Sequence, residues 1–236
     1  MKTAIKRREE ESGLDDLFGY GVNDVESTGR MTCVSNPLMD EVLALYNKHL
    51  NDDSSLFVSL DFEQVLSPEE IRHFLKITKS YSNFRDYNPR TGEFVSRLVQ
   101  NSYGSGNNHF SFNLEGFEKI KFLFSKLFAD YKNPIKIYVK GDCGSFLCDN
   151  SININIAIKG NVGNFGMSYS SSIKAAIKGD CEVNYGYGSK KLKTYLDGEF
   201  NSSLYQDIKK GFRSGDYAKN SRFYKKMMGE LEARLE

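Results

Sequence analysis

The chain has 236 residues, of which 39% are hydrophobic and 13% aromatic, and this composition excludes a wholly disordered protein. Its 32 Lys and Arg residues are nearly balanced by 31 Asp and Glu residues, so the net charge is +1. That balance supplies no global field for a polyanion and argues against a dedicated nucleic-acid binder. The N-terminus carries charges where a secretory signal needs an apolar run, and no window is long and apolar enough for a transmembrane helix.

The cysteines, Cys33, Cys143, Cys148 and Cys181, include no CxxC pair and no zinc-ligand spacing. Four cysteines in a chain of this length do not form a disulfide framework. We therefore expect a protein of the reducing cytoplasm, with neither a metal nor a cofactor.

Residues 1–30 contain 12 charged residues and little periodicity, which predicts a mobile tail. Within it, Leu17, Phe18 and Tyr20 are apolar groups that a solvated tail does not need. They are candidates for contact with a partner protein, although a segment that folds back onto its own domain explains them equally well.

Residues 31–132 are predicted to form an α-rich (α+β) unit. Apolar side chains at helical spacing indicate a helix over 38–50, and apolar alternation indicates a strand over 56–62. The run from Ser67 to Glu70 has the pattern of a capping box, with proline at the first helical position, so a helix begins there and continues to residue 81.

The later part of this unit is read in the same way. The Pro and Gly residues of 88–92 predict a break in the chain, followed by a short helix over 94–99. Alternation at Phe110, Phe112 and Leu114 predicts a short strand. Apolar residues at three- and four-residue steps then predict an amphipathic helix over 115–131.

An internal repeat occupies residues 133–203. Four glycines recur at intervals of 19 residues: Gly141, Gly160, Gly179 and Gly198. The residue two positions before each glycine is always aliphatic: Val139, Ile158, Ile177 and Leu196. Alternating apolar residues precede each glycine, and because one such repeat cannot bury its apolar face alone, neighbouring copies must stack.

The repeat predicts a β-solenoid in which each 19-residue coil lies on the next. The glycines would lie on the inward face, where two backbones approach closely. Cys143 and Cys181 would be buried thiols two coils apart, too distant for a disulfide. An antiparallel sheet of hairpins is the rival fold, but the first repeat has no turn signal at its middle.

The run from Ile156 to Asn164 resembles the GXGXG-type β-helix repeat of the glutamate synthase C-terminal domain and the formylmethanofuran dehydrogenase C subunit. The match covers about residues 135–203, and the second glycine of the pattern is replaced in the third and fourth coils. This resemblance implies right-handed coils and a structural spacer without active-site residues. The expected fold class is therefore α+β, with an α-rich N-terminal unit, a short right-handed β-solenoid of 19-residue coils and a C-terminal helix.

Residues 204–236 are predicted to contain an amphipathic helix that Ser221 caps. Its apolar stripe includes Phe223, Met227 and Leu231, which contact either the end of the solenoid or a partner, including a second copy of the chain. The helix over 115–131 would cover the other end.

No catalytic constellation emerges from the sequence. His73 lies beside an apolar stripe as a structural histidine would, and His109 follows a loop without any nucleophile motif. From residue 190 onward, 11 basic residues face seven acidic ones, with aromatic residues between them. We expect a non-enzymatic structural or protein-interaction module. The alternatives are a nucleic-acid-associated protein that uses this basic C-terminal region, and a non-catalytic accessory subunit of an enzyme complex.

Overall fold

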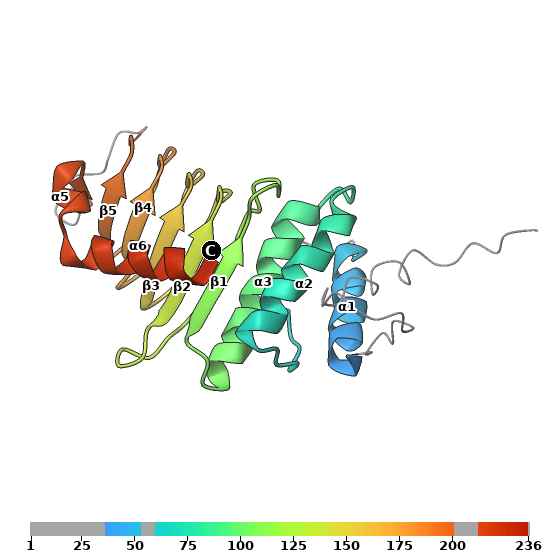
Figure 1. Cartoon of the computed structure of the whole chain (residues 1–236). Helices are drawn as coiled ribbons and strands as arrows, with labels where there is room; N and C mark the ends of the chain where they lie inside the picture. The colour runs from blue at the N-terminus through green and yellow to red at the C-terminus, as the bar shows by residue number, and fades with distance from the viewer. Residues whose placement is uncertain (1–35, 53–59, 201–211, 236) are drawn as a thin grey trace, which may run out of the picture.

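A computed structural model describes residues 36–52, 60–200 and 212–235. The helices are α1 (Pro37–Leu50), α2 (Pro68–Thr78), the 3-10 turn η1 (Lys79–Tyr81), α3 (Tyr87–Gly104), α5 (Asp216–Lys219) and α6 (Arg222–Leu235). The strands are β1 (His109–Asn113), β2 (Ile135–Lys140), β3 (Ile154–Lys159), β4 (Lys174–Lys178), β5 (Lys193–Asp197) and β6 (Phe212–Ser214). Figure 1 shows the first three helices at the β1 end of one sheet, with α6 running across the strands. No described helix is both long and apolar enough to cross a membrane.

The strands form a parallel sheet in chain order, and the chain makes about four turns of a β-solenoid over residues 135–214. Ile135 pairs with Ile154, Asn155 with Lys174 and Lys174 with Lys193, so each coil contains 19 residues. The predicted fold class is confirmed. Because every pair of strands described is parallel, the hairpin alternative is wrong.

Each coil consists of one strand followed by a wall of turns, and the two walls enclose the core. Ile137 and Ile156 point inward from the sheet, and Leu147 and Met167 point inward from the turns. All four aliphatic residues of the repeat are fully buried in this core: Val139, Ile158, Ile177 and Leu196. The same core includes the buried faces of α1, α2 and α3, so the helices and the solenoid pack as one body.

Side chains at the corner after each glycine link neighbouring coils. The backbone N–H of Asn161 donates to the carboxylate of Asp142 at 2.8 Å, and the N–H of Asp180 donates to the Asn161 side chain at 2.8 Å. The N–H of Glu199 donates to Asp180 at 2.7 Å. The acidic or amide residue after each glycine therefore satisfies a backbone donor of the next coil.

The helix predicted over 115–131 is wrong, because this segment is the turn wall of the first coil. Phe122, Phe124 and Lys126 have φ values of 58°, 60° and 54°, in the left-handed region. The N–H of Lys126 donates to the carbonyl of Asp149 in the next coil, at 2.8 Å. The turn wall buries residues at three- and four-residue steps, which is the spacing that a helix would also bury.

The N-terminal helices cover the first coil, as the helix over 115–131 was expected to do. The capping box of α2 is present at Ser67 and Glu70. The predicted break at 88–92 is wrong, since α3 begins at Tyr87 and its Pro89 lies in the first turn, where a helix needs no N–H donor. Of the strand predicted over 56–62, residues 60–62 are irregular and the others lie outside the described residues.

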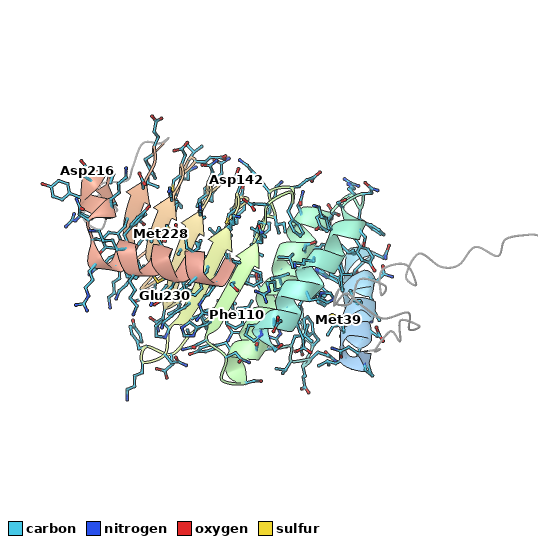
Figure 2. The ribbon with its side chains drawn as sticks, in the orientation of Figure 1. Met39, Phe110, Asp142, Asp216, Met228 and Glu230 are labelled. Carbon is cyan, nitrogen blue, oxygen red and sulfur yellow. The ribbon has the colours of Figure 1, made fainter. Side chains whose placement is uncertain are left out.

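The C-terminal helix α6 begins as predicted, with the Ser221 hydroxyl accepting from the N–H of Tyr224 at 3.0 Å. It does not cover an end of the solenoid. It lies across the outer face of the sheet, where Ala157 and Ala176 leave room for it. Figure 2 shows its Met228 and Glu230 in front of the strands. A second, smaller core forms beneath this helix.

Candidate functional site

Aromatic rings stack from coil to coil on the outside of the turn wall. The ring centroids of Phe122 and Phe146 are 4.7 Å apart and nearly parallel, and those of Phe146 and Phe165 are 5.2 Å apart. The row continues at Tyr187 and Tyr169, whose rings meet edge to face with their centroids 5.4 Å apart. We call these five residues the aromatic flank. Its three phenylalanines are partly exposed, and Tyr169 is 60% exposed.

The backbone of the turn wall directs these rings outward. Phe146 and Phe165 have φ values of 62° and 57°, while the next residue along the chain from Phe146, Leu147, is fully buried. Such left-handed conformations recur at equivalent positions of successive coils, so the rings stand in register. The spacing of 19 residues between Phe146 and Phe165 was the signal in the sequence that could have revealed this stack.

The partner-contact residues expected from the sequence have different positions. Met227 and Leu231 are buried against the sheet of the same chain, and Phe223 is partly buried beside Tyr195. Their apolar stripe is therefore occupied within the described structure. The residues of the tail, Leu17, Phe18 and Tyr20, lie outside the described residues.

The histidines do not meet a nucleophile. His73 is exposed on α2 rather than packed as a structural histidine, and His109 is half-buried with its Nε2 atom 3.2 Å from the Lys136 Nζ atom. His49 lies in the helical unit, with its Nε2 atom 4.0 Å from a carboxylate oxygen of Glu93. Burial lowers the pKa of His49 to about 4 and raises the pKa of Glu93 to about 7, so both groups are neutral at pH 6. Sequence reasoning missed this pair because its members lie on different helices.

The described cysteines are free and buried, as the repeat predicted. Desolvation raises the pKa of Cys143 and of Cys181 far above that of an ordinary thiol. These side chains act as small apolar groups, because the thiolate is the reactive form.

The four repeat glycines lie at the corners where the coils contact one another. Gly141, Gly160 and Gly179 are half-buried rather than deep in the core, and Gly198 is exposed. Among the described residues, no group of three or more His, Cys, Asp or Glu side chains is arranged to hold a metal ion. Comparison with protein-family models, with curated proteins and with solved structures found no match to this chain.

Proposed function

We propose that the protein is a non-enzymatic interaction module whose aromatic flank binds a partner protein. The observation that carries this proposal is the continuous stack of partly exposed rings from Phe122 to Tyr187. Aromatic residues are enriched in protein interfaces because each buries a large apolar area with few rotatable bonds. A contiguous apolar strip on an otherwise charged surface is typical of a docking site.

The solenoid favours this role because it holds the flank in one conformation. Hydrogen bonds between coils fix the backbone at each ring, as in the bond from the N–H of Phe146 to the carbonyl of Asn164 at 2.9 Å. Binding to such a surface costs little conformational entropy. The resemblance to the GXGXG-type repeat agrees with a structural role in the cytoplasm, and the partner would be a catalytic subunit if the protein is an accessory subunit.

The proposal is tested by affinity purification of the tagged full chain from its host, with nuclease treatment of the lysate. The variant combines Tyr169→Asn and Val183→Asp, which remove two exposed apolar side chains of 60% and 46% exposure. Asparagine tolerates the left-handed backbone of residue 169, where φ is 50°. A partner that resists nuclease and is lost from this variant supports the proposal.

The matched control is Tyr217→Asn, which removes a tyrosine that is 83% exposed on α5, away from the flank. It should retain the partner. Equal recovery of the partner by the flank variant and the wild type would show that the aromatic flank is not the binding surface.

A further inference from the structure

The outer face of the sheet carries two rows of side chains on either side of α6, and one of them is basic. This basic row crosses the strands near their first residues and consists of His109, Lys136, Asn155, Lys174 and Lys193. Each member pairs with the next in the strand register, so successive side chains are about 4.8 Å apart. Lys174 and Lys193 are exposed and Lys136 is half-buried.

The row at the other end of the strands has a mixed charge. It contains Lys140, Lys159 and Lys178, but the Lys140 Nζ atom lies 2.9 Å from a Glu115 carboxylate oxygen, and Asp197 follows in the register. The corner ladder with Asp142, Asn161 and Asp180 lies two residues further along each coil. This mixed row is the stripe of interleaved charges that the repeat predicted, and it suits solvent.

The basic row has no such neutralisation. Within the described residues, no carboxylate forms a salt bridge with Lys136, Lys174 or Lys193. The C-terminal helix adds Lys226 and Arg234 on this side, together with one carboxylate, Glu230, which accepts from the Tyr138 hydroxyl.

The local field shows in the titration of His109. Burial first, and then the charges of Lys136 and Arg234, lower the pKa of this imidazole. It is therefore neutral at pH 7, and its Nε2 atom is able to accept a hydrogen bond from the Lys136 ammonium group at 3.2 Å. The ammonium group remains a charge that an anion could reach.

An exposed aromatic ring lies beside the basic row. Tyr131 is 68% exposed, and its hydroxyl lies 3.3 Å from that of Ser172, two residues before Lys174. The same corner contains Lys191, which is exposed and close enough for its charge to help lower the pKa of the Tyr131 phenol, after the hydrogen bond to Ser172. A flat ring among ammonium groups is the combination that single-stranded nucleic-acid sites use.

We propose that this edge of the sheet binds single-stranded nucleic acid, with phosphates along the basic row and a base stacked on Tyr131. Lysines along an edge follow a phosphate backbone without reading its sequence, so affinity should depend strongly on salt and weakly on base order. The net charge of +1 does not oppose this, because the positive charge is gathered on one edge rather than spread over the molecule. The site is independent of the aromatic flank, which lies on the other wall of the solenoid.

The test is fluorescence anisotropy of a labelled single strand of about 12 nucleotides with the full chain, over a series of salt concentrations. The variant combines Lys136→Gln, Lys174→Gln and Lys193→Gln. The control combines Lys140→Gln, Lys159→Gln and Lys178→Gln on the mixed row, and both lower the net charge of +1 by three. The basic-row variant should lose affinity at least about tenfold, and the slope of log Kd against log salt should fall by about 2. The control should remain within about threefold of the wild type.

A second pair of variants tests the stacking. Tyr131→Ala should weaken binding of the single strand by about fivefold or more, whereas Tyr217→Ala should not. Three results would overturn the proposal: no binding by the wild type at about 50 mM salt, equal losses in the two triple variants, or a duplex or acidic polypeptide that binds as tightly and is insensitive to Tyr131→Ala. The thermal transitions of all variants, followed by circular dichroism, show whether each one is folded.

Discussion

A Cβ atom built on Gly160 would lie 2.2 Å from the carbonyl oxygen of Gly141, one coil earlier. The relationship recurs between Gly179 and Gly160 at 2.3 Å, and between Gly198 and Gly179 at 2.1 Å. These distances are far below any real contact of a Cβ atom. The repeat therefore requires glycine because two backbones touch at the corner, where a side chain would separate the coils.

Gly160→Ala should destabilise the protein by about 2 to 4 kcal/mol, because the obstructing atoms belong to backbone that is held on both sides. Urea denaturation followed by circular dichroism measures this loss. The matched control is Gly229→Ala in α6, where nothing lies within 4 Å of the new Cβ atom. It should stabilise the helix by about 0.5 to 1 kcal/mol. Similar effects at the two sites would contradict the close-contact explanation.

Ile158→Asp should prevent folding of the solenoid. Ile158 is fully buried and is paired with Val139 on one side and Ile177 on the other. A carboxylate there would have no partner, and its desolvation exceeds the few kcal/mol by which a domain of this size is stable. Lys159→Asp is the control, because that side chain is exposed on the outer face. A cooperative thermal transition at the wild-type temperature for Ile158→Asp would show that the register is wrong.

Glu93→Gln should stabilise the protein at pH 8 and have little effect at pH 5. Burial raises the pKa of Glu93 to about 7, above the unfolded value of 4.5, so the native state retains a proton that the unfolded state releases. Stability is therefore lost as the pH rises from about 4.5 to about 7, and the glutamine avoids that loss. The expected gain at pH 8 is about 1 to 3 kcal/mol.

The measurement for this pair is urea denaturation at both pH values. Glu69→Gln is the control, since the Glu69 side chain is 82% exposed and forms only a surface ion pair with Arg72. Its effect should stay within about 0.5 kcal/mol at either pH. A gain for Glu93→Gln that is equal at pH 5 and pH 8 would mean that the carboxyl group is not the cause. His49 changes the wild-type profile in the opposite sense, because its pKa of about 4 makes stability fall as the pH drops below 6.5.

Ala176→Leu should detach α6 while leaving the solenoid intact. Ala176 lies under the helix in a core that is separate from the main one, so extra volume there, costing about 1 to 3 kcal/mol, acts on the helix alone. Hydrogen exchange should show faster exchange in residues 222–235 and unchanged protection in β3 and β4. The same substitution at the exposed Ala233 should leave the exchange of α6 as it is in the wild type. Loss of protection throughout the sheet would show that the two cores are coupled.

Local hydrogen-bonding devices were readable because they involve neighbours in the sequence. The capping box at Ser67 and Glu70 and the cap at Ser221 each require only a few residues, and both are present. The solenoid was readable for a different reason. Stacked coils place equivalent residues in contact, so the structure repeats in the sequence at the coil length of 19 residues.

The predictions that were wrong relied on patterns that two structures share. Apolar residues over 115–131 have helical spacing, but the first coil buries the same residues through alternating left- and right-handed turns. This coil also escapes the period, since His109 pairs with Lys136, 27 residues further on. The proline and glycine at 88–92 read as a break, whereas Pro89 occupies a tolerated first turn and Gly92 allows α3 to contact the carbonyl of Lys121.

The sequence by itself determined that the chain winds in coils of 19 residues and that four aliphatic side chains form its core, because a repeat with one apolar face has to stack on its copies. Only the tertiary structure decided where the outward-facing groups meet. The aromatic flank combines residues from four coils, and the basic row combines residues from five strands with a helix that returns across them. Solvent-facing positions are under no packing constraint, so their pattern becomes a surface only when the register of the coils brings them side by side.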